Sequence, residues 1–260
     1  MIIPSRQLSS ILIYGQPGAG KTHLIGTAAG DPRIMPALYL DIEGGTFNIQ
    51  SKCLYVSSPT DITDPRSEIY KHPEIEKKFV VYKPNKFQDV KNLLDTLQQK
   101  TELKNFYKTI IIDSLTFLDL NSIRDIVTAK GRTEEAVQLN DFGVNLIRMR
   151  GIMSQLRDMA QLSIMTAHVK EPDSSTLIQL IKPQLSGKLD VTISGVVDVL
   201  GFLDIKLKGS TSTRVFSANR TATILAKDRT EGNLLSEAVE NPTFPALLDK
   251  IKYEYTGVTY

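Results

Sequence analysis

The chain has 260 residues, of which 41% are hydrophobic, and its 31 Lys and Arg side chains nearly balance 29 Asp and Glu. This length and apolar share suit one sizeable α/β unit, so we expect a single domain over residues 1–260. A formal net charge of +2 is too small for the whole surface to attract nucleic acid, so any DNA binding must be local. A lone cysteine, Cys53, excludes an intrachain disulfide, and no apolar run suits a signal peptide or a membrane span. We therefore expect a cytoplasmic protein with no membrane partner.

Apolar segments of strand length alternate with helical patterns through the first two thirds of the chain. This alternation predicts a mostly parallel central sheet flanked by helices, which is an α/β fold. Gly30 lies where a C-cap of the first helix is expected. The expected strands are residues 10–14, 36–41, 79–82, 109–113 and 162–167, and the expected helices are residues 22–29, 86–99, 115–129 and 140–160.

The last third of the chain has a different pattern. Residues 196–207, 214–217 and 223–226 are strand-like and are separated by polar turns. Together they predict a C-terminal antiparallel extension of the sheet. Two stretches rich in polar residues, 129–138 and 169–188, are expected to be mobile loops.

The octapeptide GQPGAGKT at residues 15–22 matches the G-x-x-x-x-G-K-[ST] pattern of a phosphate-binding loop, the P-loop or Walker A motif. Glycines allow the backbone N–H groups to point inward at phosphate oxygens, and the following helix presents its positive end to the same anion. The lysine can reach the β- and γ-phosphates, and the threonine hydroxyl can ligate Mg²⁺. The pattern lies between a predicted strand and a predicted helix, which is the context it requires. The expected ATP-binding residues are Gly15, Gln16, Pro17, Gly18, Ala19, Gly20, Lys21, Thr22 and His23.

A P-loop also predicts an apolar strand that ends in aspartate, because the metal needs a carboxylate beside the loop. The segment KTIIIDS provides Asp113 at that position. We expect Asp113 to hold Mg²⁺ through water, together with the hydroxyl of Thr22. An aspartate here can also serve only as the cap of the next helix, so this signal depends on the P-loop upstream.

Three motifs across residues 10–232 resemble the RecA/RadA superfamily, and in particular its small phage ATPases of single-strand annealing and recombination. The first is YLDIEGG at residues 39–45, in which Glu43 follows the second apolar strand. In RecA-like proteins this position polarises the attacking water, and a carboxylate there can orient that water at the γ-phosphate. The alternative for Glu43 is a solvated loop acid or a helix cap. The resemblance implies a RecA-like P-loop NTPase core.

The second motif is the strand LSIMTAHV, which ends at His168. RecA-like ATPases carry a polar γ-phosphate sensor at this edge, and the next loop contacts DNA, so residues 169–188 are a candidate DNA loop. The third motif is AKDRTEG at residues 226–232, which resembles the lysine-x-arginine motif of RadA-type proteins. In that family Lys227 and Arg229 would reach across to the ATP of a neighbouring subunit as an arginine finger does. A hydrogen-bonded structural histidine and solvated surface charges are the simpler alternatives.

The resemblance further implies a homo-oligomer with ATP at subunit interfaces, in the cytoplasm of a bacterial host cell. Residues 129–138 lie where the family's other DNA loop would be, and a single-strand DNA-binding protein is a possible partner. The implied activity is Mg²⁺-dependent, DNA-stimulated ATP hydrolysis. The sequence departs from full-length members in having no tryptophan and few aromatic residues in the candidate loops for base stacking.

Two other function classes use the same P-loop scaffold. A small-molecule or protein kinase is one, although the chain has no arginine-rich lid of the nucleotide-kinase type. A nucleotide-gated assembly module without a DNA role is the other, in which ATP holds subunits together and Glu43 does little. Phosphoryl transfer to an added acceptor would indicate the kinase, and tight binding without turnover would indicate the assembly module.

Overall fold

The computed structural model describes residues 8–104, 106–159, 162–170, 180–209 and 211–254. Its strands form one sheet in the order β11-β9-β8-β1-β6-β5-β2-β4-β3, with β10 beside β8 and β7 beside β6. Seven of these strands are parallel neighbours, from β8 across to β3, and the remaining four pair antiparallel. The strands are β1 Ser10–Gly15, β2 Ala37–Asp41, β3 Cys53–Val56, β4 Phe79–Tyr82, β5 Thr109–Asp113, β6 Leu162–Lys170, β7 Lys182–Pro183, β8 Val199–Lys208, β9 Thr211–Ser217, β10 Lys227–Asp228 and β11 Val239–Glu240.

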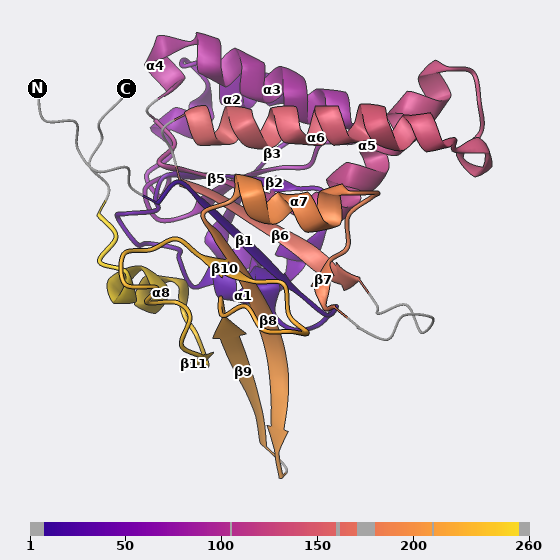
Figure 1. Ribbon diagram of the computed structural model, residues 1–260. Coiled ribbons are helices and arrows are strands. Elements are labelled where there is room, and N and C mark those ends of the chain that lie inside the picture. The colour runs from indigo at the N-terminus through magenta and orange to yellow at the C-terminus, as the bar shows by residue number, and fades with distance from the viewer. Residues whose placement is uncertain (1–7, 105, 160–161, 171–179, 210, 255–260) are drawn as a thin grey trace, which may run out of the picture.

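Helices cover both faces of the sheet (Figure 1). The larger group lies above the sheet in Figure 1, and α1 and α8 lie below it. Two buried clusters of side chains correspond to these faces, one under each group. The elements above are α2 Pro59–Thr63, α3 Phe87–Gln99, α4 Thr101–Lys104, α5 Leu115–Ala129, α6 Leu139–Asp158 and α7 Leu189–Val196; those below are α1 Lys21–Gly26 and α8 Phe244–Lys250; and the 3-10 helices are η1 Gly45–Lys52, η2 Glu68–Lys71 and η3 Glu134–Ala136.

The apolar strands are buried along their whole length, as strands covered on both faces must be. Parallel pairing fixes where they end. Gly15 of β1 is level with His168 of β6, and Asp41 of β2 is level with Asp113 of β5. The carboxyl ends of four central strands therefore meet at one edge of the sheet, where ligands bind in open α/β folds.

The α/β prediction is confirmed: a mostly parallel sheet is flanked by helices and carries antiparallel strands at its C-terminal side. The predicted bounds of β4, β5 and α5 match the observed ones. The helix expected over 22–29 is shorter, because it ends at Gly26 and turns follow up to Gly30. The strand expected over 196–207 is also wrong at its start, since Val196 ends helix α7.

The prediction of a strand over residues 223–226 is wrong as well. Only a single bridge, between Ile181 and Ile224, involves this segment, and the short strand β10 begins after it. Strand β3 and helices α7 and α8 are not among the predicted elements. No helix of the described residues is long and apolar enough to cross a membrane.

Candidate functional site

The glycine-rich loop lies between the buried strand β1 and helix α1, as its pattern predicts. Gln16, Pro17 and Gly18 are exposed, whereas Ala19 is buried against the fold. Gly20 is the N-cap of α1 and has a left-handed backbone conformation. The loop thus presents an accessible backbone directly before a helix N-terminus, where anions bind. His23 is exposed in the first turn of the helix.

Lys21 is only 7% exposed and begins helix α1. Its ammonium donates to the carbonyl oxygen of Gly15 at 3.0 Å and to that of Gln16 at 3.1 Å, so the side chain folds back over the loop. Burial lowers its pKa, an effect that the charges of Glu43 and Asp113 oppose. A cation is therefore held against the backbone of the loop.

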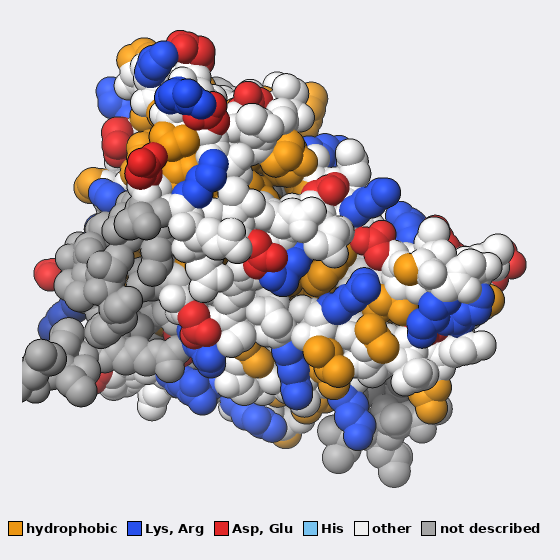
Figure 2. Space-filling model, turned by 90° about the horizontal axis from the view of Figure 1, so that it is seen from above, with side chains coloured by type: hydrophobic (Ala, Val, Ile, Leu, Met, Phe, Trp, Pro, Cys, Tyr) orange, Lys and Arg blue, Asp and Glu red, His pale blue; other side chains and the backbone are white. Residues whose placement is uncertain are grey.

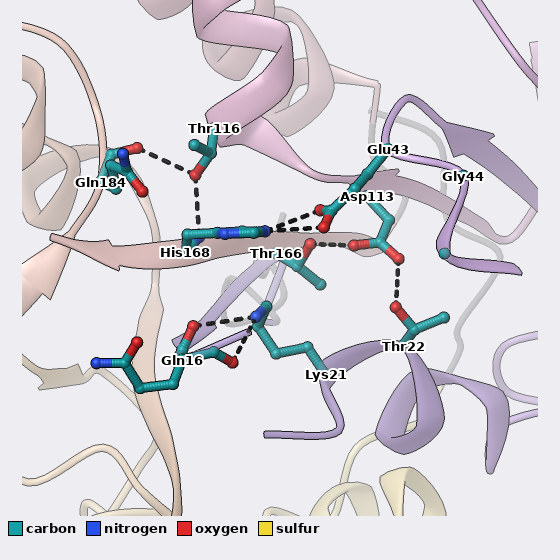
Figure 3. A network of polar contacts seen from close by, with 12 residues as sticks. Gln16, Lys21, Thr22, Glu43, Gly44, Asp113, Thr116, Thr166, His168 and Gln184 are labelled. Atoms are coloured by element: carbon teal, nitrogen blue, oxygen red, sulfur yellow. Dashed lines mark hydrogen bonds and ion pairs between the residues drawn. The ribbon is translucent and has the colours of Figure 1, made fainter. Parts of the chain in front are cut away.

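Thr22 and Asp113 meet at the same edge of the sheet (Figure 3). The Thr22 hydroxyl donates to Asp113 Oδ2 at 2.7 Å, and the Asp113 carboxylate also accepts from the hydroxyls of Tyr39 and Thr166. Burial raises the pKa of Asp113 and the charge of Glu43 adds to this, while the three hydroxyl donors oppose the shift. Because Thr22 donates its proton to Asp113, its oxygen lone pairs face elsewhere.

These oxygens suit Mg²⁺, which prefers hard oxygen ligands and retains several waters. Gly45 of η1 keeps the space beside them open, since an added β-carbon there would lie 3.0 Å from Thr22 Oγ1 and 3.4 Å from Asp113 Oδ2. Asp113 already accepts three hydroxyl hydrogens, which agrees with a role through water rather than direct ligation. Thr22 and Asp113 are thus the residues that would hold a magnesium ion on the bound phosphates.

The turn that carries Glu43 is built by Asp41 and Asp113. Asp41 accepts hydrogen bonds from the backbone N–H of Gly44 at 2.8 Å and of Gly45 at 2.9 Å. The backbone N–H groups of Ile42 and Glu43 donate to the carbonyl oxygen of Asp113 at 2.7 and 3.2 Å. The backbone at Glu43 is therefore fixed relative to the metal-side aspartate.

The Glu43 carboxylate lies against His168, whose Nε2 is 3.0 Å from both carboxylate oxygens. Burial alone would raise the pKa of Glu43, but the hydrogen bond and charge of His168 hold it below its usual range. The carboxylate is therefore ionised at neutral pH and able to accept a proton. Figure 3 shows Glu43, Lys21 and Asp113 arranged around one space, with His168 at its margin.

His168 is also tied to the segment that follows it. Its backbone N–H donates to Thr116 Oγ1 at 2.9 Å, and that hydroxyl donates to the carbonyl oxygen of Gln184 at 3.0 Å. Gln184 returns a backbone hydrogen bond to the carbonyl oxygen of His168 at 2.8 Å. The histidine next to Glu43 thus contacts the far end of the loop that sequence reasoning assigns to DNA. Residues 171–179 of that loop lie outside the described residues.

Lys227 and Arg229 lie at the opposite edge of the sheet. Lys227 is level with Leu200 of β8, and the backbone N–H of Arg229 donates to the carbonyl oxygen of Asp198, which lies beside the first residue of β1. That places Arg229 about 17 Å from the phosphate loop of its own chain, the length of strand β1. The Lys227 ammonium donates to the carbonyl oxygens of Ser194 and Val197, the latter at 2.8 Å. The Arg229 side chain is 53% exposed and lies 3.9 Å from Asp198.

Arg229 and Lys227 line a hollow of about 510 Å³ at this edge. The exposed Arg220 also lines it, from the segment that joins β9 to β10. The structure therefore brings the two predicted finger residues together with a third cation, and separates all three from the P-loop of the same chain.

Four cations of the two candidate DNA loops are paired with buried carboxylates. Lys130 and Arg132 contact Asp141 at 2.6 and 2.8 Å, and Lys170 and Lys182 contact Asp190 at 3.3 and 2.8 Å. The hydrogen bonds from Arg132 and then Lys130 hold the pKa of Asp141 far below its usual range. In Figure 2 Lys and Arg side chains spread along the lower margin of the face, interspersed with hydrophobic ones. No continuous basic groove is visible on that face.

Sequence reasoning missed several residues that position the site, namely Tyr39, Asp41, Thr116 and Thr166. For Asp41 a signal exists, because an acid that ends a strand just before a glycine pair is suited to accept the N–H groups of the turn. Tyr39 and Thr166 lie within apolar strands, and Thr116 lies at a helix start; only the strand register and the contacts of the folded chain bring them to the site.

Comparison with known proteins identifies a family that matches this chain. The sequence model of a family described as an AAA domain matches residues 9–230. No curated protein matches the sequence. Among solved structures, the flagellar accessory protein FlaH from Methanocaldococcus jannaschii is similar, with a TM-score of 0.44 and 14% identity over 85% of this chain and 79% of that one.

Proposed function

This chain belongs to the AAA-domain family, and from that premise we propose that it binds ATP with Mg²⁺ at residues 15–22 and hydrolyses it. One observation carries the proposal: Lys21, Thr22, Asp113 and Glu43, which the sequence separates by up to 92 positions, converge on one space at the carboxyl edge of the sheet. A nucleotide-binding ATPase needs this set of groups.

Each of these residues has a distinct role in the proposed reaction. The loop amides and the Lys21 ammonium bind the triphosphate, and Lys21 neutralises charge on the γ-phosphoryl group. Thr22 and Asp113 would hold a magnesium ion, which would supply further positive charge beside the bound phosphates. Glu43 orients the attacking water and accepts its proton, because its pKa is held low enough to keep it ionised.

We further propose that nucleotide state reaches a DNA-binding loop through His168. The supporting observation is the chain of contacts from Glu43 to His168 and on to Thr116 and Gln184. A γ-phosphate that competes with Glu43 for the His168 ring nitrogen would separate His168 from Glu43 and alter the Gln184 end of residues 169–188. Lysines freed from Asp190 could then contact phosphates of single-stranded DNA without reading sequence. Assistance to annealing or recombination is the role that the family resemblance suggests.

A phosphate-release assay with and without single-stranded DNA tests these proposals together. Stimulation by DNA supports the recombination role. If DNA does not change the rate of hydrolysis, the protein is an ATPase and the proposed DNA role is wrong. Phosphoryl transfer to an added acceptor would indicate a kinase, and ATP binding without turnover a nucleotide-gated assembly module.

We also propose that Arg229 acts on the ATP of a neighbouring subunit. It lies at the amino edge of the sheet, so a head-to-tail neighbour could place its P-loop edge there, and such contacts build rings or filaments. Mixing Lys21→Ala subunits with Arg229→Ala subunits should restore part of the hydrolysis, because some interfaces then carry two intact partners. If no ratio of the two variants recovers activity, the assignment in trans is wrong.

A further inference from the structure

The β8–β9 hairpin contacts both ends of the phosphate loop. At the start of the loop, a β-carbon added to Gly15 would lie 2.3 Å from the carbonyl oxygen of Leu203 in β8. At its end, Arg214 of β9 donates from Nε to the carbonyl oxygen of Ala19 at 3.2 Å. Arg214 pairs with Ile205, two residues beyond Leu203. Residues Leu203 and Arg214 of one hairpin therefore lie against the two ends of the loop that would bind the triphosphate.

The backbone of Arg214 is fixed on both sides of its strand. It pairs with Ile205 of β8 on one side, and on the other it exchanges hydrogen bonds with Asn241. The Asn241 N–H donates to the carbonyl oxygen of Arg214 at 2.7 Å, and the Arg214 N–H donates to Asn241 Oδ1 at 3.3 Å. The guanidinium is thus presented to the loop from a rigid element that lies about 195 residues away in sequence.

The contact fixes a peptide plane of the loop. In a planar trans peptide the carbonyl and the N–H point in opposite directions. When Arg214 holds the Ala19 carbonyl on the hairpin side, the N–H of Gly20 faces the other way, toward the space enclosed by the loop. A hydrogen bond from a charged donor is stronger than a neutral one, which suits the Arg214 contact to orient this peptide.

Gly20 is matched to this arrangement. Its φ is +96°, a conformation that residues with a β-carbon rarely adopt, and an added β-carbon would lie 2.5 Å from Arg214 Nε. The glycine that the P-loop pattern requires at position 20 is therefore also the residue against which the Arg214 side chain packs. The P-loop pattern itself does not include this arginine, which lies on a distant strand.

We propose that Arg214 is a positioning residue of the phosphate loop, and that its hydrogen bond to Ala19 holds the Ala19–Gly20 peptide in the orientation that binds a triphosphate. This proposal rests on the proposed function, since it concerns the same nucleotide site. It makes the affinity for phosphates depend on the β8–β9 hairpin, while the hydrolysis step, which Arg214 does not touch, proceeds as before once ATP is bound.

The test measures binding of Mg²⁺·ATP and of inorganic triphosphate by calorimetry. Arg214→Ala should weaken both by about tenfold, because a charge-assisted hydrogen bond is lost and triphosphate engages the loop without a base. At saturating ATP the turnover number should stay within about twofold of the unmodified protein, so that KM rises and kcat does not. Arg214→Lys keeps a charged donor and should recover part of the affinity.

Lys206→Ala is the matched control, since Lys206 is an exposed cation on the same hairpin. It should leave both affinities unchanged.

Arg214→Met, which keeps the aliphatic stem, replaces the alanine variant if thermal unfolding shows that the latter is misfolded. The proposal is overturned if the affinity for ATP falls while the affinity for triphosphate does not, because Arg214 would then contact the nucleoside. Unchanged affinities in a folded variant also overturn it. Failure of the unmodified protein to bind ATP would instead overturn the proposed function.

Discussion

Lys21 and Lys227 each direct an ammonium group at two backbone carbonyl oxygens, but they do so at opposite edges of the sheet. Lys21 contacts Gly15 and Gln16 of the phosphate loop. Lys227 contacts Ser194 and Val197 in the last turn of helix α7. Burial lowers the pKa of both lysines. The contacts alone therefore do not tell a ligand-binding lysine from a structural one.

The helix ends distinguish them. Lys21 is the first residue of α1, where the helix carries partial positive charge and a cation is unfavourable. Lys227 lies at the C-terminal end of α7, where the partial charge is negative and a cation stabilises the helix. The charges of Glu43 and Asp113 only partly offset the cost of burying the Lys21 ammonium at this positive helix end, since its pKa is lowered on balance. We therefore expect Lys21 to bind a ligand and Lys227 to stabilise α7.

The largest expected effect is on hydrolysis, at the edge that carries Lys21. Glu43→Gln should slow ATP hydrolysis by about 100-fold to 10,000-fold, because the carboxylate that accepts the proton of water is lost. The dissociation constant for ATP should change by less than about threefold, since Glu43 is not expected to bind the ground-state phosphates. Phosphate release and calorimetry measure the two effects. Glu231→Gln, at an exposed acid, is the control. If Glu43→Gln lost ATP affinity by as large a factor as it lost hydrolysis rate, the role of Glu43 as base would be contradicted.

Lys21→Ala should weaken ATP binding by about 100-fold, the loss of hydrogen bonds from a charged donor to phosphate. The ligand-free protein should lose little stability, because relief of a buried cation at a positive helix end offsets the loss of its hydrogen bonds to Gly15 and Gln16. Urea unfolding of the ligand-free protein measures this second effect. A variant that unfolds more easily than the unmodified protein, at matched ATP-free conditions, would show that Lys21 is structural in the way inferred for Lys227.

The lowered pKa of Lys21 predicts opposite pH trends for stability and for binding. Because the unfolded chain holds this proton to higher pH than the folded protein does, the contribution of Lys21 to stability rises as pH rises from the lowered pKa toward the ordinary value of lysine. ATP affinity should fall over the same range, since phosphates need the ammonium. Phosphates also raise the pKa of Lys21, so binding should take up protons there and not at pH 7. Calorimetry in two buffers of different ionisation enthalpy measures the uptake.

The sequence was sufficient for the parts of this molecule that local pattern controls. The loop of residues 15–22 and the strand that ends at Asp113 were found because their residue types are needed at adjacent positions. The alternation of apolar segments with helical patterns predicts the mostly parallel sheet. Helix α7 cannot be predicted from the sequence because its residues, LDVTISGV, alternate between apolar and polar types, a pattern that is typical of a strand.

Contacts between distant segments could not be predicted in the same way. The carbonyl partners of Lys227 belong largely to helix α7, which the sequence does not predict, so the pattern offers only a neighbour's ATP or a solvated surface as the place of its charge. The pairing of Lys130 and Lys182 with Asp141 and Asp190 likewise depends on tertiary packing. Arg214 lies on β9 with no motif around it, and only the fold brings it to Ala19.

The smallest effect is expected at Lys227. Lys227→Ala should lower the free energy of unfolding by about 1 kcal/mol, because α7 loses a cation that donates to its terminal carbonyls. For a chain of this size that corresponds to a decrease in melting temperature of about 2–4 °C. Lys227→Met, which keeps the stem without the charge, should lose nearly as much, and Arg229→Ala should lose less because Arg229 is half exposed. If Lys227→Ala leaves stability unchanged but abolishes hydrolysis in the assembled protein, its ammonium acts on a neighbouring nucleotide, and the contrast with Lys21 is wrong.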